Sequence, residues 1–328
     1  MIKILKLIPN KLLSIINSYR IEKQKANELK ESLNWFYGKL LLKREDSDTL
    51  LKRILLRYHV IEKGLTMPER RNGFGKDVMK ELVHDINTYI KKYGIDNEQI
   101  PVAIGVVAEY RNVHQKQGFV LDENLRKSID TLLEGHNYPA VNQLEMTKDI
   151  YFSHINQSFA DFSKSRHSLR NFSGKVNEEN LGKAFQLAQN APSACNRQAT
   201  RITVISDKDI ISKVFAIHRG NRGFGHLADK LIVLTTDMRY WEIKTAMGGY
   251  VDGGIYAMNL LYALHYYEIG ACPLNACFTP EEEKIVRELT HVSDNENFVL
   301  FIAIGGVPEN FALANSHRYD SHNLVKYL

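Results

Sequence analysis

Cysteine, long apolar runs and low-complexity segments are scarce or missing in this chain of 328 residues. Its three cysteines form no CxxC pair, which argues against a disulfide framework or a zinc site and favours a reducing cytoplasm. No window of 18 residues is apolar and free of charge, so no transmembrane helix is predicted. The composition, 44% hydrophobic and 25% charged, is that of a globular protein with two domains or one domain and a large extension.

Charge is unevenly distributed, although the formal net value is only +5. Residues 1–44 contain ten Lys or Arg and three Glu, a local net charge of +7. We interpret this basic segment either as a solvated helix or as a surface for a membrane or an acidic partner. Lysines and Pro9 interrupt its apolar residues, which favours an amphipathic element over a secretion signal. Nucleic-acid binding is not predicted, because no recognition motif accompanies the charge.

The first half of the chain is predicted to be helical. Apolar residues recur at helical spacing from Leu50 to Ile61 and again from Val78 to Ile90. Between them, residues 59–76 are rich in glycine and charge and are interpreted as an ordered loop. His59 and Glu62 lie three residues apart there, but no second such pair follows, so no metal site is predicted. A polar connector near 134–150 separates a helical extension, 1–150, from a domain at 160–328.

The second half alternates helices and strands, which predicts layers of helices on a sheet. The predicted helices are 178–189, 208–217, 245–268 and one opened by Thr279-Pro280-Glu281, and the predicted strands are 199–206, 230–237 and 297–306. A glycine-rich loop spans 219–225. The helix at 245–268 has four glycines near its start, and glycine is unfavourable inside helices, so this helix is expected to be buried or interfacial.

Three short segments carry candidate chemistry. The first, KSRHSLRNF, places Arg166, His167, Ser168 and Arg170 within five residues. Arginine forks match phosphate oxygens, so the segment is either an anion site or an exposed basic loop. The others are APSACNRQ (191–198) and ACPLNACF (271–278); each alone is also explained as a turn beside a helix.

In combination and order, these segments resemble the FMN-dependent nitroreductase family over about residues 160–328. The family's first motif is matched by Arg166, His167, Ser168, Arg170 and Phe172, and its second by Ala191, Pro192, Ser193, Asn196 and Gln198. A turn at 273–276, an "IGGVPE" segment at 304–309 and Arg318 follow. The resemblance implies an α+β fold with a mixed sheet flanked by helices, beside an α-helical N-terminal region.

The resemblance also implies a role for individual residues. The residues expected at the FMN phosphate and flavin edge are Arg166, His167, Ser168, Arg170 and Arg318. Pro192, Ser193 and Asn196 are expected to come from the partner subunit of a homodimer, and Asn221 to lie near the flavin pyrimidine edge. The turn formed by Pro273, Leu274, Asn275 and Ala276 is expected to direct a backbone N–H of Asn275 or Ala276 at flavin N5.

The function expected from the resemblance is transfer of hydride from NAD(P)H through FMN to a small organic acceptor. The flavin performs this chemistry, so no catalytic acid, base or metal is predicted in the protein. Asn275-Ala276 and Ser316 depart from the family pattern, at the N5 turn and two residues before the tail arginine. The alternative is a flavin-fold module that serves as a scaffold for an anionic or membrane-bound partner. The expected location is the cytoplasm, with peripheral attachment to the inner membrane face as the alternative.

Overall fold

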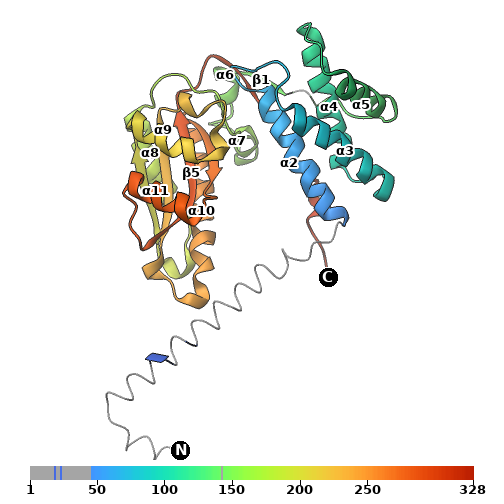
Figure 1. The fold of residues 1–328 in the computed structure, drawn as a ribbon. Coiled ribbons are helices and arrows are strands. Elements are labelled where there is room, and N and C mark those ends of the chain that lie inside the picture. The colour runs from blue at the N-terminus through green and yellow to red at the C-terminus, as the bar shows by residue number, and fades with distance from the viewer. Residues whose placement is uncertain (1–17, 20–22, 24–45, 142) are drawn as a thin grey trace, which may run out of the picture.

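The computed structural model describes residues 18, 19, 23, 46–141 and 143–328 (Figure 1). Apart from three residues, the basic segment 1–44 lies outside this part of the chain, and so does the predicted membrane or acidic-partner contact. In the described residues, no helix is both long and apolar enough to cross a bilayer.

Four helices and their connections form the first of two regions, which we call the helical region. They are α2 (Ser47–Leu65), α3 (Lys76–Tyr93), α4 (Gln99–Lys116) and α5 (Glu123–Glu134). Asp46 caps α2 by accepting from the backbone N–H of Thr49 at 2.9 Å. Ile54, Ile61 and Ile104 lie fully buried in the core that the helices share. The helical prediction for this half of the chain is confirmed.

A four-stranded sheet organises the second region, which we call the sheet region. In spatial order its strands are β2 (Thr200–Ile205), β3 (Lys230–Asp237), β5 (Glu296–Gly305) and β4 (Gly270–Asn275). The α+β class is confirmed, and the sheet predicted as mixed has three antiparallel pairs within the described chain. Because strand side chains alternate between faces, Leu231 and Val233 enter one core while Ile232 and Leu234 enter the other.

Helices cover both faces of this sheet. One face carries α8 (Glu178–Ala188) and α10 (Met247–Tyr266), and the other carries α9 (Lys208–Ile217) and α11 (Pro280–Thr290) (Figure 1). The glycines of α10 allow close packing: a Cβ on Gly253 would meet Val299 at 2.7 Å. Gly254 has nothing within 4 Å, so the opposite face of the helix is open. The prediction of a tightly packed helix holds for one of its two faces.

A small second sheet joins the two regions. Strand β1 (Leu144–Thr147) pairs with β6 (Asn310–Leu313) near the end of the chain. The predicted connector at 134–150 therefore contains a strand, which its short, polar sequence did not indicate. Short helices α6 (Lys148–Phe152) and α7 (Phe159–Ser165) then lead into the sheet region.

Two local predictions are corrected by the structure. The predicted loop 59–76 is helical as far as Leu65, because α2 keeps its buried face through Ile61, Glu62 and Leu65. The predicted turn at Pro273–Ala276 is mostly strand, since Pro273, Leu274 and Asn275 belong to β4. β4 is an edge strand, where proline's missing N–H breaks no ladder, so the proline did not exclude a strand there.

Candidate functional site

The segment that follows α7 is held by its apolar residues and presents its polar ones. Leu169 is fully buried and donates its backbone N–H to Ala271 O at 3.0 Å. Phe172 is also buried, against Gly305. Ser168 and Arg170, on either side of Leu169, remain half-buried. The segment is thus anchored to the edge of the sheet with its cationic side chains directed away from the core.

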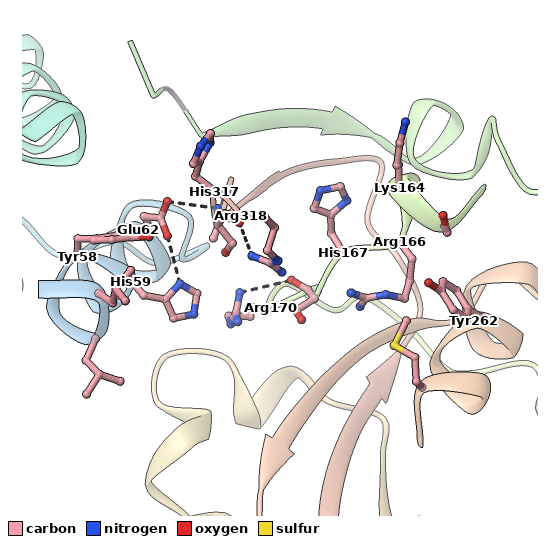
Figure 2. A pocket seen from close by; sticks show the side chains of 17 residues that line it. Tyr58, His59, Glu62, Lys164, Arg166, His167, Arg170, Tyr262, His317 and Arg318 are labelled. Carbon is pink, nitrogen blue, oxygen red and sulfur yellow. Dashed lines mark hydrogen bonds and ion pairs between the residues drawn. The ribbon is translucent and has the colours of Figure 1, made fainter. Parts of the chain in front are cut away.

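These side chains line a cavity of about 630 Å³ between the two regions (Figure 2). Five parts of the chain contribute: α2, α7, the segment after α7, α10 and the C-terminal tail. The polar lining residues are Tyr58, His59, Glu62, Ser163, Lys164, Arg166, His167, Ser168, Arg170, Tyr262, Ser316, His317 and Arg318. All five residues predicted to hold a phosphate are therefore brought together, although Arg318 comes from the far end of the sequence.

The cations of this cavity lack carboxylate partners. Arg166, Arg170 and Arg318 form no ion pair with any described residue. The Nε of Arg166 is buried without a hydrogen-bond partner. By contrast, Arg57, which also lies on α2, pairs with both Glu81 and Asp85 of α3. Buried donors are normally satisfied, so the cavity is suited to an anionic ligand.

Burial, together with this positive charge, lowers the pKa of neighbouring titratable groups. Burial, with Arg166 as the next cause, lowers the pKa of His265 to about 3. Burial also lowers the pKa of His167, and Arg166 and Arg318 add to the effect. Lys63 has a lowered pKa from burial and from Arg170. His167 and His265 are therefore neutral at pH 7, and the positive charge of the cavity comes from its three arginines and Lys164.

At a second place, His218 connects the loop that carries Asn221 to the end of the strand that carries Asn275. His218 donates from Nε2 to Asn275 O at 2.7 Å and accepts at Nδ1 from the backbone N–H of Gly220 at 3.0 Å. The histidine thus ties the end of β4 to the glycine-rich loop. Asn221 itself lines a separate cavity of about 420 Å³, and its Oδ1 is buried without a partner.

The APSACNRQ segment lies at a third place. Ser193 Oγ accepts from the backbone N–H of Gln198 at 3.1 Å, and Gln198 Nε2 donates to Asn196 Oδ1 at 3.0 Å. Cys195, Asn196 and Gln198 have positive φ angles near 50°, a conformation that few residues other than glycine adopt. Pro192 and Ser193 line a cavity of about 210 Å³ with Asp252. Within one chain, the APSACNRQ segment therefore does not line the arginine cavity.

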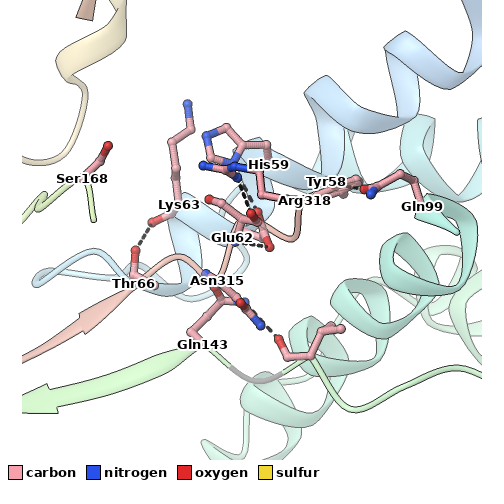
Figure 3. A network of polar contacts seen from close by, with 12 residues as sticks. Tyr58, His59, Glu62, Lys63, Thr66, Gln99, Gln143, Ser168, Asn315 and Arg318 are labelled. Atoms are coloured by element: carbon pink, nitrogen blue, oxygen red, sulfur yellow. Dashed lines mark hydrogen bonds and ion pairs between the residues drawn. The ribbon is translucent and has the colours of Figure 1, made fainter. Parts of the chain in front are cut away.

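The structure places three residues, His59, Glu62 and His218, in or beside these sites, although the sequence analysis gave them no ligand-binding role. Glu62 is fully buried, and its Oε2 lies 3.1 Å from Nδ1 of His59, which lines the arginine cavity (Figure 3). His218 is the connector described above. The i, i+3 spacing of His59 and Glu62 was visible in the sequence, but nothing there indicated which region they face. No group of three or more metal-binding side chains occurs in the part of the chain that is described.

Comparison with known proteins supports the predicted resemblance over part of the chain. Residues 163–219 match the model of the nitroreductase family. This match includes the first motif, Arg166–Phe172, and the second, Ala191–Gln198. The predicted resemblance is confirmed there, and the helical region is unmatched. No curated protein matches the chain.

Solved structures similar to this chain cover about half of it. A putative NADH oxidase from Clostridium acetobutylicum is 27% identical, over 51% of this chain and 99% of its own, with a TM-score of 0.43. An FMN-dependent nitroreductase from Clostridium difficile is 22% identical over 51% and 96%, with a TM-score of 0.43. A putative NAD(P)H:FMN oxidoreductase from Staphylococcus epidermidis is 17% identical over 52% and 96%, with a TM-score of 0.46.

Proposed function

We propose that this chain, whose residues 163–219 match the nitroreductase family, is an FMN-dependent oxidoreductase. Its electron donor is NAD(P)H and its acceptor a small organic molecule. The observation that carries the proposal is the cavity whose arginines have no carboxylate partner among the described residues. A nucleotide phosphate provides the missing charge and hydrogen-bond acceptors.

The residues that line the arginine cavity fit the phosphate of FMN. Arg166, with its unpartnered buried Nε, together with Arg170 and Arg318 would hold the phosphate, and Ser168 would add a hydroxyl donor. Asn221 and a backbone N–H of Asn275 or Ala276 would bind the flavin ring. Bound FMN supplies hydride acceptance from NAD(P)H and electron transfer to the acceptor. The protein's own contribution is orientation and charge neutralisation, and none of its side chains needs to act as a nucleophile.

The proposed assembly is a homodimer in which Pro192, Ser193 and Asn196 reach the site of the partner subunit. Two observations support it. This segment lies away from the arginine cavity of its own chain. In addition, α10 exposes an apolar stripe on its open face, in which Met247 is 51% and Val251 60% exposed. Ile255 and Met258 continue the stripe at helical spacing. A second copy would bury this stripe and bring the two parts of the site together.

An absorption spectrum tests the cofactor and the reaction together. Purified full-length protein is expected to be yellow, or to become so when reconstituted with FMN. Adding NADPH or NADH without oxygen should bleach the visible absorption band of the oxidised flavin. A quinone or nitroaromatic compound should restore the band. A protein that takes up no FMN would contradict the proposal.

Light scattering after gel filtration tests the dimer. Val251→Arg places a charge in the exposed stripe of α10, so the variant is expected to run as a monomer. FMN binding should weaken with it, because the partner's contribution is lost. Val120→Arg is the control, since Val120 is also exposed but lies in the helical region. A wild-type monomer that binds FMN fully would contradict the shared site.

A further inference from the structure

Helix α2 of the helical region forms one wall of the cavity that the arginines line (Figure 2). We propose that His59 binds the phosphate of the ligand and that Glu62 positions both His59 and the tail that carries Arg318. This inference rests on the proposed FMN site and assigns part of it to a region that the family match does not cover.

Glu62 uses its two carboxylate oxygens for two different partners. Oε2 accepts from Nδ1 of His59 at 3.1 Å, and Oε1 accepts from the backbone N–H of Ser316 at 3.2 Å. The residue is fully buried and forms no ion pair with a Lys or Arg among the described residues. It is also the one acidic side chain in the described lining of the cavity. A buried carboxylate is costly unless bonded, so its position is fixed by these two contacts.

The bond to Glu62 determines what His59 offers to a ligand. Because the carboxylate accepts at Nδ1, that nitrogen carries its proton, and Nε2 is left for another partner. The side chain is 37% exposed and lines the cavity together with Arg166 and Arg170. Nε2 can then share a charge-assisted hydrogen bond with a phosphate that is bound beside the arginines.

The same carboxylate fixes the tail. Ser316 has a φ of 50°, an unfavourable conformation that its surroundings must maintain. Its N–H is held by Glu62, and its carbonyl accepts a hydrogen bond from Nη1 of Arg318 (Figure 3). Glu62 is therefore connected through one residue's backbone to a guanidinium that lines the cavity.

Other contacts of the tail come from the helical region as well. Asn315 donates its N–H to Gln143 Oε1 at 2.9 Å, and Asp320 donates its own to Glu98 Oε1 at 3.0 Å. Tyr319 packs against the helical core. The residues on both sides of Arg318 are thus anchored to the part of the chain that precedes the sheet region.

Flavin titrations of the full-length apoprotein test the inference. Quenching of flavin fluorescence gives the Kd of FMN and, separately, of riboflavin, which lacks the phosphate. His59→Ala and Glu62→Gln should each raise the Kd of FMN about tenfold, the loss expected for one charge-assisted hydrogen bond. Their Kd for riboflavin should stay unchanged. Glu123→Gln, an exposed position on α5, is the matched control and should alter neither.

A double variant separates the two contacts of Glu62. Glutamine at position 62 retains an oxygen that can accept from Ser316, so Glu62→Gln acts mainly through His59. It should have little further effect in a His59→Ala background, whereas Glu62→Ala should still weaken FMN binding there. Equal effects of Glu62→Gln with and without His59 would overturn the coupling.

Two further results would overturn the inference: an unchanged Kd for FMN in both single variants, or an equal loss of riboflavin affinity, which would indicate general damage. A wild-type protein that binds no FMN would contradict the proposed function instead. In that case, inorganic phosphate is the probe that tests the inference. Phosphate should raise the melting temperature of the wild type more than that of His59→Ala, and equal shifts would overturn the inference.

Discussion

The helical region and the sheet region bury their apolar residues in different ways. The helical region does so with amphipathic helices that follow one another in sequence, and its core draws on residues 50–141 and Tyr319. The sheet region has two cores, one on each face of β3, whose eight residues are all buried. Family resemblance extends only to the second, yet the arginine cavity lies between the two. The lining of this cavity is therefore shared between the region that contains the family match and the region that does not.

The largest effects are expected from the two cores, and they test whether the regions are independent. Phe301→Ala should lower the free energy of unfolding by about 4 kcal/mol and Ile54→Ala by about 3 kcal/mol, because both side chains are fully buried. Urea unfolding followed by circular dichroism should show one transition in each variant, since β1, β6 and the tail link the regions. Two separate transitions would show that the regions unfold independently.

The next effect concerns the cations that the sheet region contributes. Arg166→Ala should raise the Kd of FMN about 100-fold, because it removes a forked, charge-assisted contact. Arg126→Ala is the control: that arginine pairs with Asp130 on α5 and lies outside the arginine cavity. Isothermal titration calorimetry measures both. A Kd that changes equally in the two variants would contradict the assignment of the phosphate site.

One carboxyl in each region is expected to make the stability change with pH, in opposite directions. Hydrogen bonds from Arg239 hold the pKa of the Asp237 carboxyl well below its ordinary 3.8, so its contribution is present above that pH and is lost in acid. Burial raises the pKa of Glu109 above 4.5, so stability falls as pH rises from 4.5 through the raised pKa.

Urea unfolding between pH 3 and pH 8 measures these contributions. Asp237→Asn should cost about 2 kcal/mol at pH 7 and less in acid, because it breaks hydrogen bonds to a buried charge. Glu109→Gln should remove the decline that begins near pH 4.5. A cost of Asp237→Asn that is independent of pH would show that its charge is not what matters.

The smallest effect is expected at the surface of the helical region. Glu123 and Lys127 form an exposed i, i+4 pair on α5 with an O–N distance of 2.7 Å. Glu123→Gln should change the free energy of unfolding by at most about 0.5 kcal/mol. Thermal melting at low and high salt measures this change in the free energy of unfolding. A larger change would mean that Glu123 does more than form an exposed ion pair with Lys127.

Elements with strong local patterns were predicted well from the sequence. The strand predicted at 230–237 has the same bounds in the structure, and the helix predicted at 178–189 spans Glu178–Ala188. The capping box of Thr279 and Glu282 fixes the start of α11. In each case, adjacent residues carry the information. Arg166, His167, Ser168 and Arg170 are also near one another in the sequence and line one cavity, and their binding of a phosphate stays a prediction.

Features that depend on distant residues were missed. Strands β1 and β6 are four residues each and exist because they pair with one another across most of the sheet region. Likewise, the sequence around Glu62 is that of an ordinary helix, and it does not show that the N–H of the distant Ser316 binds this carboxylate. The end of α2 was predicted too early because its last turns are rich in charge, and the burial of Glu62 is a tertiary effect.

The pairing of β6 with β1 and the packing of Tyr319 against the helices have a consequence for synthesis. The helical region leaves the ribosome before the sheet region, but the tail residues that complete its surface are translated only after the whole four-stranded sheet. Ser316 and Arg318 therefore cannot reach Glu62 until the sheet region has been made. A product that stops at residue 309 would keep all four strands of the sheet and lack the tail residues that line the arginine cavity.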